Sequence, residues 1–161
     1  MQEGRVLAQI DLGQEFIDHA AQRIGGGYEI VTRCLLPPDF MGLVCDPALP
    51  AWDRLLDVYK AHAAGQKIDL FIGRRTHRLF RGAGVKDIRV DAVLHVYPPG
   101  HDRRPILRDF INNVRDKLIT QRFVTQRELE SDMASLEHHL ADPNVMVTSN
   151  TFFRLIGRVP A

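Results

Sequence analysis

An alternation of apolar and polar residues between Asp87 and Tyr97, interrupted at Val93, constrains this chain more than any other feature. The segment ends at Pro98, because proline cannot donate to a β-ladder. A basic helical segment, Arg74–Arg81, precedes it and is closed by glycines. The apolar members of the alternation fall on one face of an extended chain: Ile88, Val90, Ala92, Leu94 and Val96. The pattern predicts a strand over Ile88–Val96 in a sheet that helices cover.

The rest of the chain predicts further helices and strands. Apolar residues recur at helical spacing in four segments: Gln14–Ile24, Pro50–Ala64, Ile106–Ile119 and Gln126–Leu140. Thr125 and Glu128 have the spacing of a capping box before the last of these helices. Apolar runs predict strands at Arg5–Leu12, Tyr28–Cys34 and Thr151–Val159. The fold class is therefore α/β.

The order of elements also predicts how the strands pair. A strand, a helix, Gly25-Gly26-Gly27 and a second strand follow one another near the start of the chain. This order is typical of a right-handed crossover between parallel strands, so we predict that Arg5–Leu12 and Tyr28–Cys34 are parallel. We predict that Thr151–Val159 pairs antiparallel with Ile88–Val96.

Size and composition bound the protein class. The 161 residues predict a single domain over 1–161, with 45% hydrophobic and 25% charged residues. A net charge of +1 gives no global attraction to nucleic acid or to anionic membranes. No stretch has the length of a membrane span and no secretory signal pattern is present, which predicts a cytoplasmic protein. Cys34 and Cys45 are expected to be reduced thiols, with a disulfide as the alternative.

The long loop Leu35–Leu49 draws attention as a functional segment, because long loops in compact domains often carry function. Its first polar and aromatic residues follow a predicted strand, at the edge where open sheets bind ligands. The predicted substrate-binding residues are Asp39, Phe40, Trp52, Tyr59 and Tyr97. A role in the core is the alternative for Trp52 and Tyr59. For Arg74 and Arg75, an exposed or capping role competes with binding of an acidic substrate.

Other chemistries find little support in the sequence. The seven histidines include no pair at metal-ligand spacing with a third ligand nearby, so no metal site is predicted. Cys45 is more consistent with a small apolar filler than with a nucleophile. No residue can be designated as catalytic.

Several short motifs occur in an order that resembles the C-terminal, substrate-side part of class I S-adenosylmethionine-dependent methyltransferases. The resemblance covers roughly residue 26 to the end. The motifs are Val44-Cys45-Asp46-Pro47, Ile72-Gly73-Arg74-Arg75, Leu79-Phe80-Arg81, Ala83-Gly84-Val85, Leu140-Ala141-Asp142-Pro143 and Gly157-Arg158. The resemblance implies a partial doubly wound, Rossmann-like sheet with parallel strands, a C-terminal antiparallel pair and helices on its faces. It also implies a small-molecule substrate beneath the helix pair Ile106–Ile119 and Gln126–Leu140.

The chain departs from the family pattern at the cofactor site. A nucleotide-type cofactor needs a glycine-rich turn after a strand, where backbone N–H groups approach it closely. Here Gly25-Gly26-Gly27 precedes a strand instead. S-adenosylmethionine is therefore implied by the resemblance alone, and we predict that the isolated chain binds it weakly or not at all. Retention of the substrate half by a non-methylating binding protein is the alternative function.

Loss of the family's first strands would leave the strand Arg5–Leu12 without a neighbour. An apolar strand edge is a template for pairing with another chain. We therefore expect a homodimer, or a complex with a cofactor-binding subunit, through this edge.

Overall fold

The computed structural model describes residues 21–24, 27–32 and 39–159. The predicted strand Arg5–Leu12 and the assembly edge that it forms lie outside these residues. The chain forms two compact units, which are described separately below. The first unit contains Phe71–Val93 and Phe152–Ala161 together with the N-terminal residues, and the second contains Phe40–Leu70 and Leu94–Thr151. The chain passes repeatedly between the two units, so the division does not test the prediction of a single domain.

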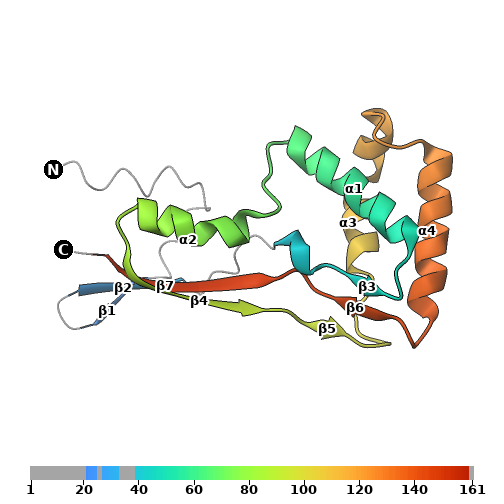
Figure 1. Ribbon diagram of the computed structural model, residues 1–161. Helices are drawn as coiled ribbons and strands as arrows, with labels where there is room; N and C mark the ends of the chain where they lie inside the picture. The colour runs from blue at the N-terminus through green and yellow to red at the C-terminus, as the bar shows by residue number, and fades with distance from the viewer. Residues whose placement is uncertain (1–20, 25–26, 33–38, 160–161) are drawn as a thin grey trace. The chain divides into compact units, whose positions relative to one another are not determined.

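The first unit is built on a four-stranded sheet of order β1-β2-β7-β4 (Figure 1). Its strands are β1 (Ala21–Ile24), β2 (Gly27–Thr32), β4 (Lys86–Val93) and β7 (Phe152–Val159). All the hydrogen-bonded pairs between these strands are antiparallel. The α/β class is confirmed, but the parallel, Rossmann-like pairing predicted for its strands is wrong in the described sheet.

The N-terminal prediction fails where a hairpin replaces a helix. We expect Gln14–Ile24 to be helical, yet its described residues, Ala21–Ile24, form a strand that pairs with Gly27–Ile30; the rest of the segment lies outside the described residues. Ile24 lies opposite Gly27, so the glycine run separates two paired strands instead of ending a helix. A short, glycine-rich connection is the composition of a tight hairpin, and tertiary pairing overrides a helical pattern of this length.

The predicted C-terminal pair is confirmed. β4 and β7 are antiparallel, with Val93 opposite Phe152 and Lys86 opposite Arg158. β2 is also antiparallel to β7, on its other side. Since β2 and β4 both run opposite to the strand between them, they point in the same direction as each other.

Helix α2 (Ile72–Gly82) packs on this sheet through a small apolar core. Phe80 and Val85 pack with the fully buried Leu155, and Ile88 and Phe153 extend the cluster. The other apolar residues of β4 contribute little to this core, because Val90 and Val93 are 43% and 47% exposed. The basic residues of α2 lie mostly on its solvent side, as expected for a half-buried helix.

Gly157 is required by the close approach of β7 to the segment that enters β4. A Cβ at this position would overlap Val85 Cγ1 and lie 3.1 Å from the Lys86 carbonyl oxygen. We expect Gly157→Ala to lower the free energy of unfolding by about 1–2 kcal/mol, because overpacking forces backbone movement. Urea unfolding measures this loss. Gly82→Ala is the control: nothing lies within 4 Å of its added Cβ, so stability should stay unchanged or rise slightly, and an equal loss there would contradict the steric explanation.

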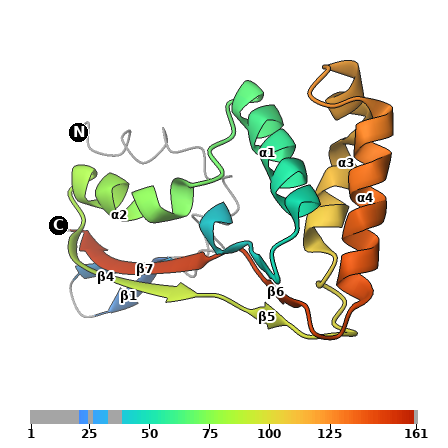
Figure 2. The ribbon, with the colours of Figure 1, turned by 45° about the vertical axis from the view of Figure 1, so that its right-hand side comes forward.

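The second unit is a bundle of three helices beside a small sheet (Figures 1 and 2). The helices are α1 (Pro50–Gly65), α3 (Ile106–Thr120) and α4 (Gln126–Ala141), and each begins within one residue of the start predicted from sequence. Their fully buried residues form the core of the bundle: Leu55, Leu107, Ile111, Leu118, Leu129 and Leu136. No helix in the described part of the chain has both the length and the apolar character needed to cross a membrane.

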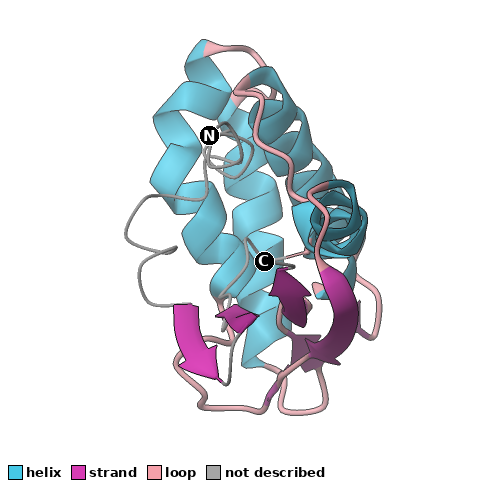
Figure 3. Cartoon of the chain, turned by 90° about the vertical axis from the view of Figure 1, so that its left-hand side faces the viewer, coloured by secondary structure: helices cyan, strands magenta, loops and turns pink. Residues whose placement is uncertain are grey.

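The small sheet has the order β3-β6-β5, with all pairs antiparallel. Its strands are β3 (Cys45–Asp46), β6 (Met146–Thr148) and β5 (Val96–Tyr97). The predicted strand Ile88–Val96 is therefore divided, because β4 and β5 belong to different sheets. Figure 3 separates these strands from the helices by colour.

Candidate functional site

Asp39, the first of the predicted substrate-binding residues, is fully buried in the first unit. Its Oδ2 accepts hydrogen bonds from Arg74 Nε at 2.7 Å and from the Arg74 backbone N–H at 3.2 Å. Its Oδ1 accepts from Arg74 Nη2 at 2.5 Å. The carboxylate thus caps the first turn of α2, where the helix dipole favours negative charge. These contacts give Asp39 a clear role in anchoring the helix.

Gly73 explains how Asp39 comes so close to α2. A Cβ at Gly73 would lie 3.1 Å from Asp39 Cβ and 2.7 Å from Phe153 Cδ2. The glycine therefore leaves room for both neighbours at the start of the helix. The Gly73-Arg74 pair of the sequence motif supplies the space and the guanidinium for one buried ion pair.

Phe40, Tyr59 and Phe110 form an aromatic cluster in the second unit. Their ring centroids are 5.4–5.5 Å apart, and the rings of Phe40 and Tyr59 are stacked within 13°. Phe40 is buried, whereas Tyr59 and Phe110 are half-buried. Burial raises the pKa of the Tyr59 hydroxyl above its ordinary value. The cluster offers flat apolar faces of the kind that stack on a planar ligand.

Trp52 and Tyr97 are both buried in the same unit. The indole N–H of Trp52 has no acceptor among the described residues. The nitrogen itself is buried, so this donor lies in the core of the unit. The ring of Tyr97 is tilted by 32° against that of His101, with ring centroids 4.7 Å apart. The structure thus places Phe40 beside Tyr59, and among the described residues neither ring forms an aromatic pair with Trp52 or Tyr97.

Arg104 holds the end of the helical bundle together and was not singled out from sequence. It is 4% exposed, and its guanidinium donates to four backbone carbonyls: Tyr97 at 3.0 Å, Leu140 at 3.1 Å, Asp142 at 3.0 Å and Val145 at 2.7 Å. Leu140 and Asp142 lie at the C-terminus of α4, where the helix dipole favours a positive charge. The arginine therefore links β5, the end of α4 and the chain entering β6.

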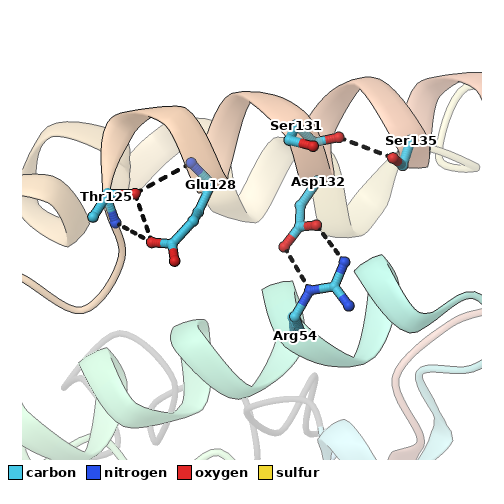
Figure 4. A network of polar contacts seen from close by, with 6 residues as sticks. All are labelled: Arg54, Thr125, Glu128, Ser131, Asp132 and Ser135. Carbon is cyan, nitrogen blue, oxygen red and sulfur yellow. Dashed lines mark hydrogen bonds and ion pairs between the residues drawn. The ribbon is translucent and has the colours of Figure 1, made fainter.

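A groove of about 730 Å³ lies between α1 and α4. Arg54 crosses it to Asp132, with Nε–Oδ2 and Nη2–Oδ1 distances of 3.0 and 2.6 Å (Figure 4). The side chains of Val58, Phe123 and Val124 supply its apolar lining. Asp132 is largely buried and the Arg54 side chain is 59% exposed, so the pair fixes the guanidinium at the groove surface.

Thr125 and Glu128 close the N-terminus of α4 beside this groove (Figure 4). The predicted capping box is confirmed: Thr125 Oγ1 accepts from the Glu128 N–H at 3.3 Å, and Glu128 Oε2 accepts from the Thr125 N–H at 3.0 Å. The Thr125 hydroxyl also donates to Glu128 at 2.6 Å. These hydrogen bonds lower the pKa of Glu128 below its ordinary value of 4.5, the hydroxyl contributing most.

The capping box predicts an acid-sensitive contribution to stability. A depressed pKa stabilises the folded state above the unfolded value, and this contribution is lost as the pH falls through the folded value. We expect Glu128→Gln to be less stable than the wild type at pH 7, with a difference that shrinks below pH 4.5. Thermal unfolding across this pH range measures the difference. Glu137→Gln, on an exposed part of the same helix, should show no such trend, and a parallel trend would contradict the assignment to the cap.

Other reactive groups give no alternative centre in the described part of the chain. Cys45 is a free, buried thiol, and its burial raises its pKa, which disfavours the nucleophilic thiolate. No cluster of three metal-ligating side chains occurs among the described residues. The Arg54–Asp132 pair and the ring of Phe110 were not among the predicted site residues. All three residues lie in predicted helices, where the sequence pattern indicated only whether a side chain is exposed or buried.

Comparison with known proteins identifies no family for this chain, so its function is argued from its residues. A scan against protein-family models found no match for the chain, and a search of curated proteins found none either.

Proposed function

We propose that this chain is the acceptor-binding part of an S-adenosylmethionine-dependent methyltransferase that acts on a small molecule. The cofactor would be held by a glycine-rich segment that the printed sequence does not contain, either on a partner subunit or on further chain. The Arg5–Leu12 edge is the proposed contact with a partner, whether a cofactor-binding subunit or a second copy.

The observation that carries this proposal is the placing of β7 between β2 and β4. The methyltransferase resemblance assigns β2 and β4 to successive strands of a doubly wound sheet, and β7 to its closing antiparallel strand. In the described sheet β2 and β4 point the same way and β7 opposes both. This arrangement agrees with the assignment of these three strands, whereas the antiparallel hairpin of β1 with β2 is not part of a doubly wound sheet.

The helical unit supports the acceptor-binding role. The resemblance implies that α3 and α4 cover the substrate, and the second unit places Phe110 of α3 against Phe40 and Tyr59. Stacked rings favour a flat, apolar acceptor. We therefore propose Phe40 and Tyr59 as its contacts, with Trp52 and Tyr97 as further lining residues. Asp39 contributes through the anchoring of α2.

Methyl transfer asks little of side-chain chemistry. Holding the acceptor atom in line with the sulfonium methyl group supplies most of the rate enhancement. A rigid aromatic cluster can position a flat acceptor without a catalytic base. No residue of this chain is therefore proposed to move a proton in the reaction.

A non-methylating binding protein is the second candidate function. The observation that favours it is that no described strand is followed by a glycine-rich turn into a helix; Gly25-Gly26-Gly27 follows β1 but leads into the strand β2. In this case the aromatic cluster would bind the same class of molecule and release it unchanged. The two functions differ only in whether a cofactor-binding partner completes the site.

Acceptor binding can be tested by nuclear magnetic resonance with small phenols and indoles. We expect shifts of the Tyr59 and Phe110 ring signals, retained in Tyr59→Phe and lost in Tyr59→Leu. Phe152→Leu is the control, since Phe152 belongs to β7 of the first unit and not to the cluster. If no planar compound perturbs the cluster, or if all of them act equally on Tyr59→Leu, the acceptor-binding proposal fails.

A further inference from the structure

The groove between α1 and α4 contains charged groups that the proposed methyl transfer does not use. Its three acidic residues already have partners: Asp57 with Lys60, Glu128 with Thr125, and Asp132 with Arg54. Arg127 and the Ser131 hydroxyl also line the groove, and neither side chain makes a hydrogen bond or ion pair with the described residues. The unused polar groups of the groove are therefore mainly donors.

These donors stand beside an apolar surface. Val58, Phe123 and Val124 are each half-buried and line the same groove. Arg54 has two of its nitrogens fixed by Asp132, which leaves Nη1 as a further donor held in a defined orientation. The volume of about 730 Å³ lies within the range of small-molecule sites.

Taken together, the geometry points to a second binding site, for an organic carboxylate with an apolar body. The carboxylate would accept hydrogen bonds from Arg127, Ser131 and the remaining nitrogen of Arg54, since guanidinium groups match planar carboxylates. The apolar body would cover Phe123 and the two valines. Two of the three lining acids, Asp132 and Asp57, are compensated by Arg54 and Lys60, and the charge of Arg127 acts on the third, Glu128. This inference does not depend on methyl transfer.

The test uses the whole chain and three probes: octanoate, octanol and inorganic phosphate. Octanoate should shift the amide signals of Val124 and Ser131 in a saturable manner. Octanol and phosphate should bind at least tenfold more weakly, because each lacks one half of the recognition. Equal binding of octanol would show that the donors are not used, and equal binding of phosphate would show that the apolar lining is not used; either result overturns the proposal.

Two variants with the same change of charge complete the test. Arg127→Gln should weaken octanoate binding about tenfold, the usual scale for loss of one charge-assisted contact. Arg108→Gln removes an arginine that pairs with Asp109 outside the groove and should leave the affinity unchanged. Circular dichroism checks that both variants remain folded. An unchanged affinity in Arg127→Gln, or an equal loss in Arg108→Gln, contradicts the site.

Discussion

Replacement of Arg104 by methionine should lower the free energy of unfolding by at least about 3 kcal/mol, or prevent folding of the helical unit. Methionine keeps most of the side-chain volume but donates to none of the four carbonyls that Arg104 holds. Each buried acceptor left without a donor costs about 1–3 kcal/mol, and local relaxation recovers part of that sum. Urea unfolding followed by circular dichroism measures the loss.

Two further variants separate geometry from charge. Arg104→Lys keeps the charge but cannot present the planar fork, so it should lose much of the same stability. Arg103→Met removes an adjacent, exposed arginine and should change stability by less than about 0.5 kcal/mol. Full stability of Arg104→Lys would show that charge alone matters, and would contradict the role given to the four carbonyls.

Replacement of Asp39 by asparagine should cost about 2–3 kcal/mol. The amide has nearly the same shape, but it loses the ion pair and turns a donor group toward a guanidinium. Charge-assisted hydrogen bonds in buried positions contribute about this much. Thermal unfolding of the first unit, followed through near-ultraviolet dichroism of Phe80 and Phe153, gives the measurement.

Asp91→Asn is the matched control for Asp39. Asp91 pairs with Arg154 through both Nε and Nη2, but both side chains are about half exposed. Exposed pairs of this kind contribute less than about 1 kcal/mol. Equal losses of unfolding free energy in the two variants would show that burial does not determine how much the Asp39–Arg74 pair contributes to stability. If Asp39→Asn stays stable and loses only acceptor binding, Asp39 contacts the substrate, as the sequence predicted, and does not mainly stabilise the fold.

The helices could be predicted because their apolar residues repeat over several turns. Pro50 and Thr125 marked helix starts, and the Thr125–Glu128 box forms as expected. The alternation before Pro98 likewise predicted a strand and its antiparallel partner. These signals are local, and the tertiary structure agrees with the helices and the antiparallel pair but divides the predicted strand between β4 and β5.

The N-terminal segment shows where local pattern is insufficient. The helical spacing in Gln14–Ile24 was equally compatible with a strand over its last residues, and pairing with β2 decides for the strand. The assumption of a crossover then made the partners of β2 parallel, whereas β1 and β7 both oppose it. Whether two strands pair parallel or antiparallel depends on segments far apart in the sequence, and a local residue pattern does not predict it.

The site was partly predictable for a similar reason. Phe40 was chosen because it follows a predicted strand, and Tyr59 as an aromatic residue of the next predicted helix; the structure brings the two together. Arg104, within the Asp102-Arg103-Arg104-Pro105 segment, had the pattern of a solvated loop. Its burial depends on carbonyls from three segments that converge only in the folded chain. The pairing of Arg54 with Asp132 spans 78 positions and has no local signature.

Calorimetric titration of the purified chain with S-adenosylmethionine tests most directly whether it carries the acceptor side of methyl transfer and not the cofactor side. The account predicts no saturable heat below the millimolar range, because no described strand is followed by a glycine-rich turn into a helix that would offer backbone N–H groups to the cofactor. S-adenosylhomocysteine should behave in the same way. Saturable binding of either compound at micromolar concentration would contradict the account, and would require a cofactor site built from other backbone amides of this chain.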